Sequence, residues 1–167
     1  MELETSQQAG GPHHFLAQLA GSWAGDGTLW FEPDKPPAAE HTFEGSFTLR
    51  ADGLWAQFEC SYHMLDTDVV GNATIATDLG RDQWQVAWID SFHTGNAVML
   101  SVGPIPAPGS EGPALDVLTS YAMGDSPPWG WRTTLELVTP DELLYRHKNI
   151  TPDGLECPAV ELRLQRR

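Results

Sequence analysis

A carboxylate in an otherwise apolar pattern is the first residue of chemical interest. Trp84, Val86, Trp88 and Asp90 alternate along one segment, so they share one face of a strand. A carboxylate among indoles is costly unless it is paired or hydrogen-bonded, so Asp90 needs a partner. An acid in such surroundings is suited to holding the polar group of a ligand or to general acid–base chemistry.

A second set of polar residues lies in a later alternating segment. Arg146 and Lys148 favour the solvent side there, which turns Tyr145, His147 and Asn149 inward. The phenol and the imidazole can each donate and accept a hydrogen bond. We therefore expect this face to join the carboxylate at one end of an apolar cavity.

The resulting hypothesis is a polar cluster that orients the polar head of a small, mostly apolar ligand. Arg132 alternates against Trp131 and Thr133, so its direction stays open. Under the alternative interpretation, these residues satisfy one another as a core network or stand at the mouth of a barrel, where His93 is expected. The predicted ligand-binding residues are Trp88, Asp90, His93, Tyr121, Arg132, Tyr145 and His147.

Motifs for other kinds of chemistry are missing from the sequence. No spacing resembles a zinc or iron site, and His41 with Glu44 lacks a third ligand. There is no Gly-x-Ser-x-Gly elbow and no phosphate-binding glycine loop. We therefore predict a binding protein without catalytic or metal-ligating residues. An enzyme that uses Asp90 or His147 as general acid or base is kept as an alternative.

Composition limits the partners. The formal net charge of −14 repels phosphate backbones, so nucleic acid is not an expected partner. No apolar run approaches the roughly 20 residues that span a bilayer, so no membrane is expected. Residues 1–12 are predicted to be a flexible tail without the features of a signal peptide, which makes the cytoplasm the expected location. Residues 13–167 are predicted to form one domain.

Short alternating segments must position the candidate residues. After a short helix over residues 13–20 come about ten such segments, separated by turn residues, and no second helix. Connections of hairpin length predict an all-β, up-and-down antiparallel barrel, with a sandwich as the alternative. The proline-rich loop over residues 103–113 is expected to guard the opening. The predicted strands are 22–31, 41–49, 54–64, 69–78, 83–92, 96–102, 114–123, 129–138, 142–150 and 156–165.

The stretch from Gly21 to Gly27 is the segment around which this barrel is organised. Trp23 is expected to plug its base, and Gly25 and Gly27 mark a bend or a close backbone approach. The pattern Gly21-x-Trp23-x-Gly25-x-Gly27 resembles the Gly-x-Trp signature of the calycin superfamily. It is similar to two bacterial groups in particular, the nitrobindin-like haem proteins and the lipocalin-like DUF1579 family. Two further stretches, Trp88-Ile-Asp-Ser91 and Pro152-Asp-Gly154, resemble DUF1579.

This resemblance runs from about His14 to Arg167. It implies a lipocalin-like barrel, often a homodimer, with no established activity. Nitrobindins hold haem iron through a His near the start of the final strand, where this chain reads Glu156-Cys-Pro-Ala-Val160. No cofactor is therefore expected, and haem remains an alternative with His147 as the first candidate ligand and His93 as the second.

Overall fold

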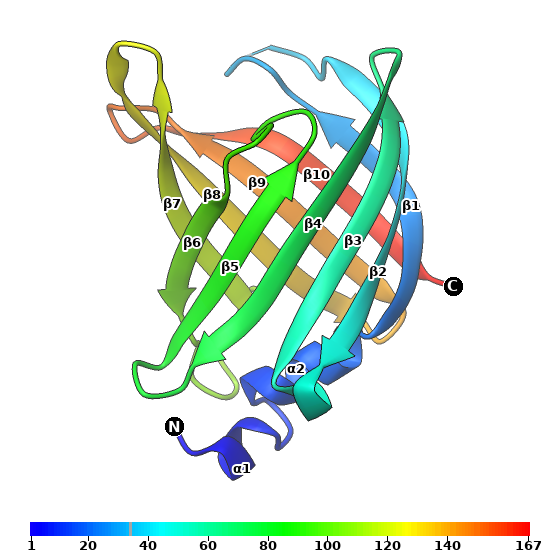
Figure 1. The fold of residues 1–167 in the computed structure, drawn as a ribbon, viewed down its shortest axis with the longest axis vertical. Coiled ribbons are helices and arrows are strands. Elements are labelled where there is room, and N and C mark those ends of the chain that lie inside the picture. The colour runs from blue at the N-terminus through cyan, green and yellow to red at the C-terminus, as the bar shows by residue number, and fades with distance from the viewer. Residues whose placement is uncertain (34) are drawn as a thin grey trace.

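Ten antiparallel strands close into a barrel in the computed structural model, which describes residues 1–33 and 35–167, with Met123 in its backbone only. The strands are β1 (Gly21–Leu29), β2 (Ala39–Arg50), β3 (Trp55–Met64), β4 (Thr67–Asp78), β5 (Gln83–Asp90), β6 (Met99–Pro104), β7 (Leu115–Met123), β8 (Ser126–Thr139), β9 (Glu142–Ile150) and β10 (Glu156–Arg166). Each strand pairs with its sequence neighbours, and β1 pairs with β10 (Figure 1). The predicted up-and-down barrel is confirmed, and the sandwich alternative is wrong because the sheet closes on itself.

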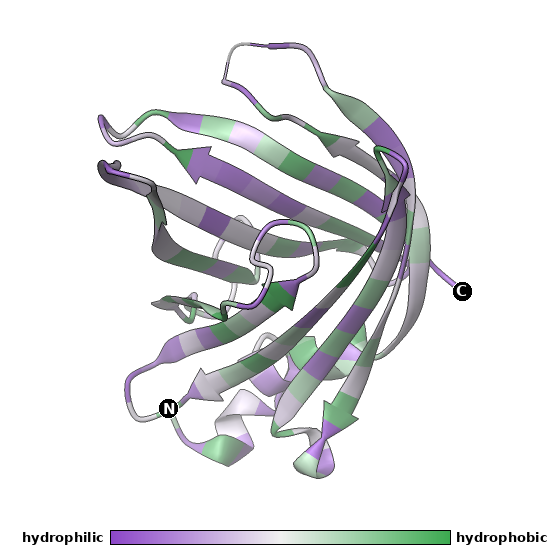
Figure 2. Cartoon of the chain, turned by 45° about the horizontal axis from the view of Figure 1, so that its top comes forward, coloured by the Kyte–Doolittle hydropathy of each residue, from purple (hydrophilic) through white to green (hydrophobic). Residues whose placement is uncertain are grey.

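The strand boundaries follow the alternation of hydrophobic and hydrophilic residues, which Figure 2 shows along most strands. β9 begins and ends at the predicted residues. β8 begins earlier than predicted, at Ser126 rather than Trp129. The turn is made by Gly124 and Asp125, and Gly124 has a positive φ of 57° that suits a two-residue hairpin. The prolines after Ser126 therefore belong to the strand and not to the turn.

One end of the barrel is closed by the helix α2 (Pro12–Leu19), which lies across it in Figure 1. Leu16 and Leu19 are fully buried in the core. The indole of Trp23 donates a hydrogen bond of 2.8 Å to the carbonyl of Leu19. The guanidinium of Arg166 lies 4.3 Å from the centre of the Trp23 ring and donates to the carbonyl of Ala20 at 2.7 Å. The predicted plug at the base of the barrel is therefore present, and Arg166 on the last strand, β10, holds it in place through these contacts.

The N-terminal residues pack against this closed end. The sequence predicts a flexible tail over residues 1–12, whereas the structure gives a helical turn, α1 (Leu3–Ser6), and buries Ser6. The Ser6 hydroxyl lies 2.7 Å from Nδ1 of the buried His13. This contact ties the segment to α2. No helix among the described residues is long and apolar enough to cross a membrane.

The proline-rich loop between β6 and β7 also lies at the closed end. Its flanking residues, Ile105 and Ala114, pack against the core, and Ala114 accepts a hydrogen bond of 2.9 Å from the Trp84 indole. The expectation that this loop guards the opening is therefore corrected. In an up-and-down barrel, successive connections alternate between the two ends, and the β6–β7 connection falls on the α2 side.

Candidate functional site

The end of the barrel opposite α2 contains a cavity of about 230 Å³. Aromatic rings form most of its wall, and no lysine or arginine is among the described residues that line it. Closer to α2 the interior is filled, because the Phe58 ring packs 4.3 Å from Phe47 and 5.7 Å from Tyr145, measured between ring centres. The lining residues are Leu29, Trp30, Phe31, His41, Phe43, Tyr62, Met64, Trp88, Asp90, Phe92, His93, Tyr121, Trp131, Tyr145, His147, Asn149, Ala159, Val160 and Leu162.

Asp90 is buried in this wall, at the end of β5, and has the partners that the sequence required. Its Oδ2 accepts a hydrogen bond of 2.6 Å from the Trp88 indole. Its Oδ1 accepts hydrogen bonds from three backbone amides: that of His93, that of Phe92 at 2.8 Å and that of Thr94 at 3.4 Å. Both oxygens are therefore occupied in holding the turn after β5. This arrangement makes Asp90 a residue that shapes the rim and leaves it poorly placed to take a proton from a ligand.

Tyr145 and His147 on β9 point into the cavity, as the alternation predicts. They are only 4% and 7% exposed, and their ring centres are 4.6 Å apart. Nδ1 of His147 lies 2.9 Å from the Thr133 hydroxyl. Burial lowers the pKa of His147 to about 3, with a smaller contribution from His93, so its imidazole is neutral at pH 7. Burial likewise raises the pKa of Tyr145 well above its ordinary value.

An aromatic rim surrounds the mouth of the cavity. His93 stacks on Trp131 with ring centres 4.7 Å apart, and Tyr121 meets His93 edge-on at 5.5 Å. The Tyr121 hydroxyl donates a hydrogen bond of 2.7 Å to the Asn149 side chain. Desolvation lowers the pKa of His93, partly offset by the charge of Asp90. His93 is thus at the rim, where the sequence placed it.

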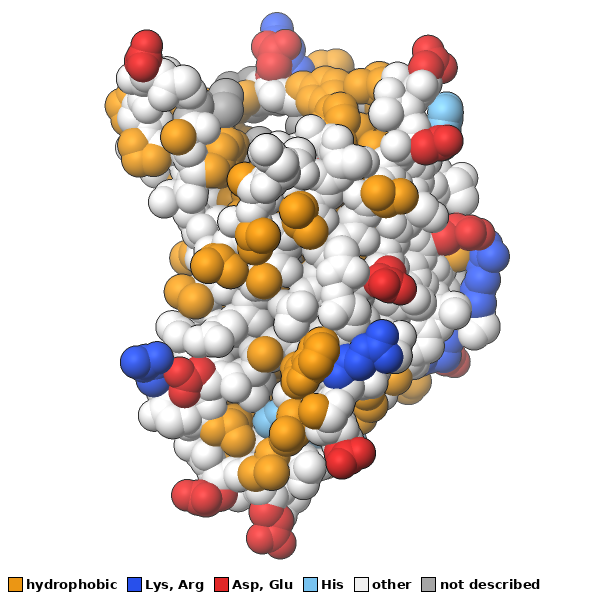
Figure 3. All heavy atoms as spheres, in the orientation of Figure 1, with side chains coloured by type: hydrophobic (Ala, Val, Ile, Leu, Met, Phe, Trp, Pro, Cys, Tyr) orange, Lys and Arg blue, Asp and Glu red, His pale blue; other side chains and the backbone are white. Residues whose placement is uncertain are grey.

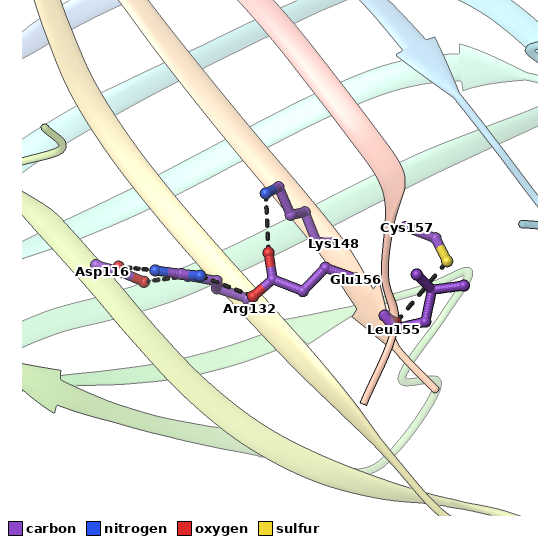
Figure 4. A network of polar contacts seen from close by, with 6 residues as sticks. All are labelled: Asp116, Arg132, Lys148, Leu155, Glu156 and Cys157. Carbon is purple, nitrogen blue, oxygen red and sulfur yellow. Dashed lines mark hydrogen bonds and ion pairs between the residues drawn. The ribbon is translucent and has the colours of Figure 1, made fainter. Parts of the chain in front are cut away.

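Arg132 is the predicted site residue that the structure keeps out of the cavity. It lies on the outer face of β8 and is held by Asp116 and Glu156 at 2.5 and 2.7 Å, while Lys148 contacts the same glutamate at 2.9 Å (Figure 4). These partners come from β7 and β10, so the pattern of β8 alone could not reveal them. The inclusion of Arg132 among ligand-binding residues is corrected accordingly.

His41 and Tyr62 line the cavity but are absent from the predicted set. Their ring centres are 4.9 Å apart, and both ring nitrogens of His41 are buried without a hydrogen-bond partner in the described chain. Desolvation lowers the pKa of His41. A signal was available in the sequence, since His41 alternates with Phe43 on the inner face of β2.

Two glycines make room for the rings of the wall. A Cβ on Gly27 would fall 2.6 Å from Cε1 of His41, and a Cβ on Gly71 would fall 2.5 Å from the Trp88 ring. On β10, the pairing with β9 shifts between Pro158 and Val160, so that both Ala159 and Val160 line the cavity. The backbone itself therefore shapes the hollow.

The cavity does not fit the haem alternative. A cavity of roughly 150 Å³ holds one benzene ring, and a porphyrin carries four pyrrole rings around its iron. The hollow beside His147 measures about 230 Å³, which is too small to enclose such a macrocycle. No group of three or more His, Cys, Asp or Glu side chains that could hold a metal ion occurs within the described residues.

Comparisons with known proteins agree with this fold. The structure is similar to the crystal structure of Rv2717c from M. tuberculosis, with a TM-score of 0.62 at 14% identity, over 92% of this chain and 96% of that one. It is also similar to the S-type phycobiliprotein lyase CPES from Guillardia theta, with a TM-score of 0.51 at 13% identity, over 100% and 98% of the two chains. No curated protein matches the sequence. The model of the family "Protein of unknown function (DUF1579)" matches residues 8–166, so the chain belongs to the DUF1579 family.

Proposed function

We propose that this protein binds a small, mostly apolar molecule in the cavity at the open end of its barrel. The observation that carries the proposal is the aromatic-walled hollow of about 230 Å³ in an otherwise filled interior. Ligand pockets commonly measure roughly 300–1,000 Å³, so this cavity lies below the usual range and its ligand must be small. The cavity has about one and a half times the volume of one of roughly 150 Å³ that holds benzene.

An enzyme is the alternative function. The similar barrel from Guillardia theta is described as a phycobiliprotein lyase, so barrels of this fold include at least one catalyst. In this chain, however, both oxygens of Asp90 already accept hydrogen bonds, and His147, with a pKa of about 3, is a weak base near neutral pH. Binding is therefore the function that this geometry supports best.

Filling the cavity should weaken binding of a small apolar ligand. Toluene is expected to change the tryptophan emission of the protein in a saturable way, because Trp88 and Trp131 line the hollow. Ala159→Phe adds a benzene-sized group there and should weaken toluene binding at least tenfold. The matched control is Ala107→Phe, which adds the same group to an exposed loop near α2. Native mass spectrometry of the purified protein would also reveal any ligand that it retains. Equal affinity in both variants would place the binding site elsewhere and contradict the proposal.

We also infer that two copies associate through the outer face of β4 to β7. Val70, Leu100, Val102 and Leu118 are exposed there, and Val102 pairs directly with Leu118 across the two strands. Figure 3 shows hydrophobic side chains gathered over this side of the barrel. A chain with a net charge of −14 repels a second copy least where its surface is apolar. This largely apolar face is thus the surface on which self-association is least opposed.

Charges on this face should produce monomers. Leu118 and Leu100 are 46% and 67% exposed, so changing both to Glu leaves the core intact and adds four negative charges to a paired interface. Light scattering coupled to gel filtration should show a dimer for the natural protein and a monomer for this double variant. Leu155→Glu, at another exposed position, serves as the control. A natural protein that is monomeric at every concentration would disprove the pairing.

The calycin relationship and the cytoplasmic location remain predictions. The first is supported by the contacts of Trp23 with Leu19 and Arg166, which give the Gly-x-Trp pattern its role in closing the barrel.

A further inference from the structure

We propose that the cavity selects a neutral ligand with one hydrogen-bonding group, such as a phenol or alcohol, and excludes carboxylates and phosphates. This inference rests on the proposed binding function and names the chemical class of its ligand. It follows from the charges in the wall, from the polar atoms that are free to reach a ligand, and from the shape of the aromatic lining.

The first argument concerns charge. The described lining residues include neither lysine nor arginine, and the one formal charge among these described residues is the carboxylate of Asp90. The three imidazoles of the lining, those of His41, His93 and His147, are all disfavoured as cations by burial. An anionic ligand would therefore lose its hydration, meet a fixed negative charge and find no cation to offset either cost.

The second argument concerns hydrogen bonding. The Tyr145 hydroxyl and Nε2 of His147 make no hydrogen bond to the part of the chain that the structure describes. Both atoms are also accessible from the cavity. Among the described residues, the side-chain nitrogen and oxygen atoms that are fully buried and have no hydrogen-bond partner are the two ring nitrogens of His41 alone. Their rings lie side by side, with centres 4.6 Å apart, on the wall of the cavity. One hydroxyl or carbonyl on the ligand can satisfy both atoms.

The third argument separates a neutral ligand from a cation. Aromatic faces attract cations, and Asp90 adds a negative charge to the wall. The Asp90 oxygens, however, already accept from the Trp88 indole and from backbone amides, so they have little capacity left for an ammonium group. The unused polar atoms, a phenol and an imidazole, match a neutral partner instead.

Four ligands of similar shape test the inference by calorimetry: toluene, p-cresol, benzoate and benzylammonium. We expect p-cresol to bind about five- to tenfold more tightly than toluene, the effect of a net hydrogen bond. Benzoate should bind at least about 100-fold more weakly than p-cresol, since burying an unpaired carboxylate is costly. Tyr145→Phe should reduce the advantage of p-cresol over toluene at least twofold, because only Nε2 of His147 is then left to bond the ligand, and should leave toluene binding unchanged.

Thr48→Val is the control, because it removes an exposed hydroxyl on the outer face of β2, and it should leave the preference for p-cresol intact. Benzoate within tenfold of p-cresol, or benzylammonium tighter than p-cresol, would overturn the inference. So would a p-cresol advantage that Tyr145→Phe leaves undiminished, or no such advantage in the natural protein. Failure of all four ligands to bind would instead count against the proposed binding function itself.

Discussion

Replacing Gly25 with alanine is expected to lower the free energy of unfolding by roughly 3 kcal/mol, the upper part of the range for overpacking. A Cβ at this position would fall 1.9 Å from the backbone oxygen of Arg163, on the strand that closes the barrel against β1. A flexible side chain could turn away from such a contact. A backbone carbonyl within a sheet cannot move without breaking the pairing of β1 with β10.

Gly80→Ala is the matched control for this substitution. Its Cβ would lie 3.4 Å from the nearest atom, an oxygen of the Asp78 side chain, and the position has no left-handed φ. We expect Gly80→Ala to change stability by less than about 0.5 kcal/mol. Thermal unfolding should place the midpoint of Gly25→Ala about 10 °C below that of the control, given roughly 2–4 °C per kcal/mol at this chain length. Equal midpoints would mean that β1 and β10 are not packed this closely.

The faces of the strands were predictable from sequence because their alternation is local. Trp88 and Asp90 on β5, and Tyr145 and His147 on β9, follow a period of two, and the structure brings all four to the cavity. The close approach at Gly25 was also predictable, since glycine in a strand interior marks such contacts.

The outward direction of Arg132 and the size of the cavity depend on contacts between distant segments. Arg132 is turned outward by Asp116 on β7 and Glu156 on β10, neither of which is adjacent in sequence. The size of the hollow is set by how far α2 and Phe58 fill the interior and by the pairing shift before Val160. The side on which the β6–β7 loop falls required only counting connections, so this error was avoidable.

Acid should destabilise this protein through His147, beginning at a pH above that at which carboxylates take up protons. Burial lowers the pKa of His147 from 6.5 to about 3 in the folded chain. Between these two values the unfolded chain binds a proton at this position and the folded chain does not. The contribution of His147 to the free energy of unfolding is therefore fully present above pH 6.5 and is lost as the pH drops towards 3.

The predicted loss between pH 7 and about pH 4.5 is roughly 3 kcal/mol from this one group, at 1.36 kcal/mol for each pH unit below the unfolded pKa. The pKa values of His41 and His93 are also lowered, so the natural protein loses additional stability over the same interval. The contribution of His147 is isolated by His147→Gln, which retains a hydrogen-bonding group near Thr133 but cannot take up a proton.

Urea denaturation at the two pH values measures both proteins. We expect His147→Gln to be less stable than the natural protein at pH 7, because glutamine does not have the shape of the imidazole that it replaces. On acidification its free energy of unfolding should fall by about 3 kcal/mol less than that of the natural protein. Leu143→Ala, a change at a fully buried residue of the same strand that removes no titratable group, should lower stability at both pH values and lose as much stability on acidification as the natural protein. If His147→Gln lost as much stability in acid as the natural protein, the imidazole would have to be protonated in the folded state. A protonated His147 would place a positive charge in the cavity, and the argument that the cavity excludes anionic ligands would then fail.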